Sequence, residues 1–243
     1  MTKASRVPLV GAFLLGMLCP LASVSAQQRP PIADEIAKTY GFDSFGQVDA
    51  IRYTFHLDLP GLKLARSWIW EPKTDQITYE GPDKDKKPVK VTYKRSEIAN
   101  QSPLVKEFID PSFFNDQYWL VFPFHMVWDT GATVEDAGMK KLPLGKGSAR
   151  KVVVKYPPSG GYLPGDTWEI YVGKDLRVQE MFFRRGGSTK PTIVAANWIN
   201  YKKAGPLLVS LNHKGKADGK AFTLFFTNVA VRLNGSTTWT EAK

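Results

Sequence analysis

The 243-residue sequence contains a single cysteine, Cys19, and only three histidines. Cys19 falls within an N-terminal targeting segment, so the rest of the chain can form no disulfide and offers no thiol for catalysis. No two histidines have the spacing of metal ligands. Ser159 lacks the Gly-x-Ser-x-Gly context of a hydrolase nucleophile. The sequence therefore presents no motif for a metal site or for nucleophilic catalysis, and we expect no cofactor.

The first 26 residues have the pattern of a cleavable signal peptide. Two basic residues are followed by an apolar run and by the small residues Val24-Ser25-Ala26, which suit a cleavage site. The residues before Cys19 do not fit a lipid-attachment signal, in which small residues adjoin the modified cysteine. We therefore expect export to the periplasm and a soluble product that forms one domain over residues 27–243.

Acidic residues are fewer than basic ones. The whole chain carries 33 Lys and Arg against 23 Asp and Glu, and the predicted mature chain keeps 31 basic residues after loss of Lys3 and Arg6, a net charge of +8. In an exported protein such a charge favours an anionic membrane surface or a cell-wall polymer as partner, not nucleic acid. The alternative is a solvated basic surface with no specific partner. We expect a monomer.

Most of the chain shows the period-two alternation of half-buried strands. In residues 51–59, five apolar side chains alternate with Arg52, Thr54, His56 and Asp58, which predicts one dry and one wet face. Short turns separate these segments, as in an antiparallel meander. We count nine to eleven strands and predict a mainly β protein with a single curled antiparallel sheet, an incomplete barrel. The segments are 51–59, 64–72, 76–81, 88–95, 150–156, 167–173, 177–187, 191–205, 206–215 and 221–233.

Helices are expected at two places only. Residues 31–40 begin with proline and repeat apolar side chains every four residues, which predicts a short amphipathic helix that ends at Gly41. A second helical pattern starts at Ser102 and Pro103. We expect Pro111 to break it, and a further helix to run from residue 112 to residue 122.

The segment from Phe113 to Trp128 contains seven aromatic residues and a single charged one, Asp116. A segment of this composition must be buried, but it is too short and too interrupted to span a bilayer. It is also apolar around the whole helix circumference, which indicates enclosure on several sides. The segment is a core element, a plug in an apolar cavity or a lid over one. His125, within it, fits a hydrogen-bonded structural histidine.

These features together resemble the LolA/LolB-like superfamily of periplasmic lipoprotein carriers and their outer-membrane receptors. The resemblance covers most of residues 31–235, and the phrase NYKKAGPLLVSL (residues 200–211) is similar to the late hairpin of such proteins. The segment NDQYWLVFPFHMVWD also resembles uncharacterised exported proteins of the same layout. The resemblance implies an incomplete barrel whose mouth is covered by helices, over a cavity that takes acyl chains. The carriers hold this lid closed with an arginine inside the barrel, and no alignment assigns Arg52, Arg66 or Arg184 to that role.

We therefore predict a non-catalytic protein that binds a lipid or an acylated molecule beneath a helical lid. The ligand-binding residues that we predict are aromatic. The lid would carry Phe114, Tyr118, Trp119, Phe122 and Phe124, and the wall Phe55, Trp68, Trp70 and Phe182, with Trp128 and Trp168 beside them.

Three alternatives stay open. The aromatic residues would be plain core if no cavity lies beneath them. A cell-envelope module that binds glycan or protein would show an exposed aromatic row and a filled interior. A hydrolase would need a carboxylate pair across neighbouring strands, and Glu169 and Glu180 are candidates for it. A further set of candidate carboxylates is the acidic cluster of Asp129, Glu135 and Asp136.

Overall fold

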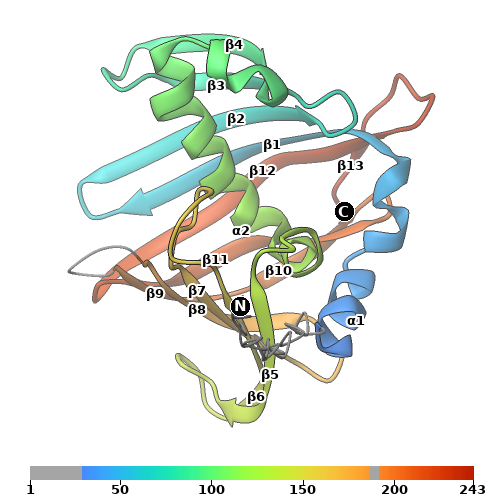
Figure 1. The fold of residues 1–243 in the computed structure, drawn as a ribbon, viewed down its shortest axis with the longest axis vertical. Coiled ribbons are helices and arrows are strands. Elements are labelled where there is room, and N and C mark those ends of the chain that lie inside the picture. The colour runs from blue at the N-terminus through green and yellow to red at the C-terminus, as the bar shows by residue number, and fades with distance from the viewer. Residues whose placement is uncertain (1–28, 187–191) are drawn as a thin grey trace, which may run out of the picture.

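The computed structural model describes residues 29–186 and 192–243 (Figure 1). The predicted signal peptide and Cys19 lie outside the described residues. The described chain forms one large antiparallel sheet that does not close, together with a few helices, and this confirms the predicted fold class.

The sheet follows the order β4-β3-β2-β1-β12-β11-β9-β8-β7-β6-β5. Eleven of its thirteen strands lie on this path, while β10 pairs only with β11 and β13 only with β12. The strands are β1 (Val48–Leu59), β2 (Leu62–Glu71), β3 (Gln76–Pro82), β4 (Pro88–Lys94), β5 (Thr133–Lys141), β6 (Ser148–Lys155), β7 (Thr167–Val172), β8 (Val178–Arg184), β9 (Ile193–Asn197), β10 (Ile199–Ala204), β11 (Leu207–Ala217), β12 (Lys220–Leu233) and β13 (Thr240–Glu241).

The predicted alternation places the core on one face of this sheet. In β1, Ile51, Tyr53 and Phe55 are buried, whereas Arg52 and His56 lie on the other face. The first and last long strands, β1 and β12, pair through most of their length, with register shifts that mark bulges. Bulges bend a strand and increase its twist, so they help this wide sheet to curl around the core.

The N-terminal helix α1 (Pro31–Thr39) confirms the first helix prediction and buries Ile32 and Ile36. Gly41 ends it with a positive φ of 96°, and a Cβ at this position would meet the Pro206 carbonyl oxygen at 2.3 Å. Only glycine, which has no Cβ, can adopt this positive φ and still lie so close to the Pro206 carbonyl. A 3-10 turn, η1 (Phe42–Gln47), then leads into β1.

The long helix α2 (Asp110–Trp128) crosses one face of the sheet, from the β3–β4 end towards α1 (Figure 1). It is preceded by the 3-10 segment η2 (Arg95–Asn100) and by a π-helical turn, η3 (Val105–Ile109), that continues directly into it. Pro111 therefore does not break the helix as predicted: it follows directly on the π-helical turn, and the chain stays helical through it. The helix also continues past residue 122.

Candidate functional site

Helix α2 is divided into two halves by a break at Val121, whose φ and ψ are −125° and 22°. Pro123 causes the break, because it has no N–H to donate to the carbonyl of Trp119 and its ring crowds that carbonyl. The half from Asp110 to Leu120 faces β1–β4 on one side and β7–β9 on the other. The half from Phe122 to Trp128 packs towards α1 and η1, where Phe124 contacts Phe42 and Phe45.

A buried ion pair fixes the first half of α2 to the sheet. The guanidinium of Arg66, on β2, donates two hydrogen bonds to the fully buried Asp116 carboxylate, of which the Nε–Oδ2 bond is 2.8 Å long. The same carboxylate accepts the indole N–H of Trp68 at 2.9 Å, and Arg66 also donates to the Ser112 hydroxyl at 3.0 Å. Burial raises the pKa of Asp116, and Arg66 acts in the opposite direction.

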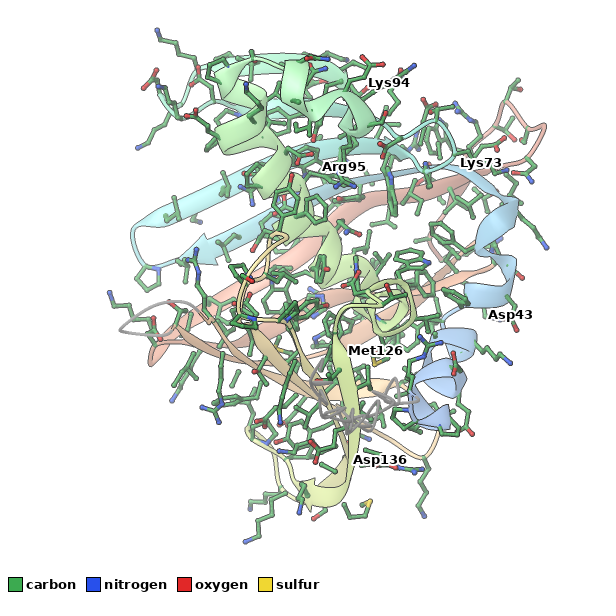
Figure 2. The ribbon with its side chains drawn as sticks, in the orientation of Figure 1. Asp43, Lys73, Lys94, Arg95, Met126 and Asp136 are labelled. Atoms are coloured by element: carbon green, nitrogen blue, oxygen red, sulfur yellow. The ribbon has the colours of Figure 1, made fainter. Side chains whose placement is uncertain are left out.

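A second carboxylate, Asp110, anchors the start of α2. It is fully buried and accepts hydrogen bonds from the hydroxyls of Tyr93, at 2.8 Å, and Tyr162. The Arg95 guanidinium lies 3.3 Å from Asp110 and 4.1 Å from the centre of the Phe114 ring, beside the helix (Figure 2). Both carboxylates of this half-helix are therefore bound by partners from β2, β4 and the adjoining segments.

The end of α2 carries a hydrogen-bonded network around His125. Its Nδ1 lies 3.1 Å from Asp129, and its Nε2 lies 2.9 Å from the amide nitrogen of Gln117. Burial lowers the pKa of His125, against the effect of Asp129, so the neutral ring donates through Nδ1 and accepts at Nε2. Asp129 also accepts from Tyr118 and Tyr156. His125 is thus buried and hydrogen bonded, as predicted, and its purely structural role stays a prediction.

The helix packs directly onto the sheet beneath it. Phe122 stacks on Trp168 with ring centres 4.3 Å apart, and Phe113 packs edge-on against Trp68 at 5.5 Å. The side chains of α2 thus occupy the region where an apolar cavity beneath a lid was expected. The open space lies beside the first half of the helix instead.

A cleft of about 350 Å³ runs along that side of α2, towards β7, β8 and β9. Its lining is mainly aromatic and aliphatic, with a few polar residues from α2, the sheet and the segment before β7. The lining residues are Pro111, Phe114, Asn115, Tyr118, Trp119, Tyr162, Leu163, Asp166, Trp168, Phe183, Arg185, Thr192 and Val194.

The segment 157–166, which we call the strap, borders this cleft and joins the sheet to the helix. On the helix side, Tyr162 stacks on Phe114 with ring centres 3.8 Å apart, yet it remains 41% exposed. On the sheet side, Asp166 accepts the backbone N–H of Gly186 at 2.7 Å. A Cβ at Gly186 would come within 2.1 Å of Gly165, so the two backbones touch and only glycine fits.

The structure brings four of the predicted ligand-binding residues together at the cleft: Phe114, Tyr118, Trp119 and Trp168. Their contact with a ligand stays a prediction. The others lie elsewhere. Phe122 is fully buried behind Trp168, and a separate aromatic group packs around the second half of α2 or below Phe113. This group comprises Trp68, Trp70, Phe124 and Trp128. Phe55 lies apart from it, against Phe226 and beneath the Arg66 guanidinium.

Phe182 is the one residue assigned to the wrong face. It pairs with Glu169 across the outer side of β7 and β8, and the Arg184 guanidinium lies over its ring at 4.4 Å. Its neighbour Phe183 pairs with Trp168 and lines the cleft. Because Phe182 and Phe183 are consecutive and both apolar, the sequence does not show which of them faces the core. The register shift between Tyr171 and Val172 also prevents the turn from fixing which residues of β8 face inward.

The carboxylates that a hydrolase would need do not meet in this cleft. Glu169 lies 3.3 Å from the Lys151 ammonium, and Glu180 accepts the backbone N–H of Leu144 at 2.7 Å. Asp136 pairs with Arg150. In residues 29–186 and 192–243, no three His, Cys, Asp or Glu side chains gather as a metal-binding group would require. Over the same ranges, no helix combines the length and the apolar character needed to cross a bilayer.

No family model and no curated protein matches the sequence. Several solved structures are similar in fold, including the following two. A DUF1329 family protein from Desulfovibrio piger is 10% identical, with a TM-score of 0.46 over 87% of this chain and 96% of that one. A domain described as an outer membrane lipoprotein-sorting protein, from Vibrio parahaemolyticus, is 11% identical, with a TM-score of 0.48 over 87% and 95%. At these values neither comparison carries an argument about the function of this chain.

Proposed function

We propose that this protein binds a hydrophobic ligand, such as one acyl chain of a lipid or acylated molecule, in the cleft between α2 and β7–β9. The observation that carries the proposal is the aromatic lining of a cleft of about 350 Å³, which is bordered by the strap. Small-molecule sites have volumes of roughly 300–1,000 Å³ and mostly apolar walls. The cleft lies at the lower end of that range, which suits one chain better than two.

The energetics of such binding suit a reversible carrier. Burial of about ten methylenes at about 0.8 kcal/mol each gives a gross gain of about 8 kcal/mol. Association and ordering of the chain remove much of this gain. One chain would therefore bind weakly enough to leave again. We propose that the protein holds its ligand without changing it chemically.

The proposal also includes where the protein works and what it meets. The signal-like residues 1–26 support export to the periplasm, and the excess of basic residues supports contact with an anionic membrane surface. We propose that the protein acts there as a monomer that receives its ligand from a membrane or delivers it to one.

A second candidate is a cell-envelope binding module without an internal ligand. The close packing of α2 on the sheet favours it, because a filled interior leaves less room for a lipid. A glycan-binding module would use a row of exposed aromatic rings. Among the described residues, Tyr162 is the most exposed aromatic residue, at 41%, and Phe114 covers one face of its ring.

A pair of neighbouring substitutions tests the cleft. Val194 lines the cleft, whereas Ile193 is 37% exposed on the opposite face of β9. Val194→Phe should fill the cleft and reduce the binding of a fluorescent fatty-acid probe, while Ile193→Phe should leave binding unchanged. Thermal unfolding of both variants checks that each is folded. If folded Val194→Phe binds the probe as well as wild type does, the ligand does not occupy this cleft.

A further inference from the structure

The wall of the cleft changes from apolar to polar across two successive rows of the sheet. In the inner row, Trp168 pairs with Phe183, and Phe183 pairs with Val194. The next row outward is formed by Arg185 and Thr192, whose backbones are hydrogen bonded at 2.9 Å. Side chains two residues apart on a strand share a face, so Phe183 and Arg185 both point into the cleft.

Arg185 brings a positive charge to this polar end. It forms no ion pair with a carboxylate among the described residues, whereas the adjacent Arg184 lies 3.9 Å from Glu169 on the outer face. Asp166 is the only acidic residue that lines the cleft. It is 5% exposed, accepts the Gly186 N–H and forms no ion pair with Arg185 among the described residues. Burial raises the pKa of Asp166, and the Arg185 charge acts in the opposite direction.

The inner row offers a further unsatisfied group. The indole nitrogen of Trp168 is buried and has no hydrogen-bond acceptor among the described residues. Buried donors without an acceptor are rare in folded proteins, and they often mark a place where a water or a ligand atom belongs. The cleft therefore combines an apolar wall with a cation at one end.

We infer that the ligand of this cleft is an anionic amphiphile, whose chain lies on Trp168, Phe183 and Val194 and whose head group binds the guanidinium of Arg185. The inference rests on the proposed function and specifies its ligand class. A fatty-acid carboxylate and a lipid phosphate share the required chemistry, since arginine binds either group with two parallel hydrogen bonds. A neutral amphiphile of equal chain length would lose this contact.

The test is calorimetric titration of the purified protein with lauric acid, the matching fatty alcohol and the matching alkyl phosphate. The measurement is made at a pH where lauric acid is ionised. Wild type should bind at least one of the two anions about tenfold or more tightly than the alcohol, as expected for charge-assisted hydrogen bonds. Preference for the acid would identify the source as a free fatty acid, and preference for the alkyl phosphate would identify a phospholipid.

Neighbouring arginines supply the matched variants. Arg185→Gln should abolish the preference for the anion and retain binding of the alcohol, whereas Arg184→Gln should retain the preference. An anion preference that survives Arg185→Gln, or its absence in wild type, would overturn the inference and leave the proposed function standing. If wild type binds none of the three compounds, the proposed function fails as well.

Discussion

His213 is a buried histidine with no hydrogen-bond partner among the described residues, and this makes the stability of the protein sensitive to acid. Its side chain on β11 is fully buried between the rings of Trp119, Trp198 and Phe226, whose centres lie 5.4, 4.7 and 5.9 Å away. Within residues 29–186 and 192–243 neither ring nitrogen has a hydrogen-bond partner, although backbone groups of Asn197 and Ser210 lie near. Protonation would place an unpaired charge in an aromatic environment.

The size of the effect follows from the pKa of this group. Burial lowers the pKa of His213 from 6.5 to about 3, so the folded protein keeps the ring neutral where the unfolded chain already binds a proton. The stability contributed by the neutral ring is complete above pH 6.5 and is lost as pH falls towards 3, by about 1.4 kcal/mol per pH unit. At pH 4.5 the loss is roughly 3 kcal/mol.

Urea unfolding at pH 7 and pH 4.5 measures this loss. His213→Phe should lose roughly 3 kcal/mol less stability than wild type between the two pH values, because phenylalanine fills the aromatic site without a titrating group. All other acid-sensitive groups are shared by the two proteins and cancel. His56→Gln is the control, since His56 is partly exposed on the outer face and should change the pH dependence much less. Equal losses in wild type and His213→Phe would refute the reasoning.

Three further predictions concern the stability of the fold and the rate at which a ligand leaves the cleft. Asp116→Ala should lower the free energy of unfolding by about 3–5 kcal/mol in urea titrations, because it leaves Arg66 buried without its partner. The double variant Arg66→Met with Asp116→Leu should lose less than this, and a larger loss would contradict the account. Gly41→Ala should cost about 1–3 kcal/mol in thermal unfolding through its positive φ, and an unchanged melting temperature would oppose this. Tyr162→Ala removes the stack on Phe114 and should speed probe dissociation in stopped-flow measurements; unchanged dissociation would show that the strap does not limit exit.

Much of the fold could be predicted because the sequence repeats a simple physical pattern. Period-two alternation identifies a strand with one buried face, and it places most of the meander correctly. Strand β5 was not predicted, because its sequence, TVEDAGMKK, has no such alternation. It is held at the edge of the sheet by pairing with β6, and a bulge lies between Asp136 and Met139. Pairing with a neighbouring strand is a long-range effect that a local pattern does not contain.

The site was less predictable, because it depends on which surfaces meet. The composition of residues 113–128 indicates burial on all sides, but a helix without an apolar stripe carries no information about what covers each side. Asp116, the single charge in this run, signals a buried partner, and the sequence does not say that the partner is Arg66, 50 residues away. The choice between Phe182 and Phe183 depends on strand register, which the neighbouring strands set.

Mass spectrometry of a solvent extract tests the central claim most directly. The protein would be purified from an exporting host without detergent, and its extract compared with that of the Val194→Phe variant. The account predicts an acyl-chain compound that is stoichiometric with wild type and depleted in the variant. A wild-type protein that carries no such compound and also fails to bind a fluorescent fatty-acid probe would contradict it, and would favour the cell-envelope binding module.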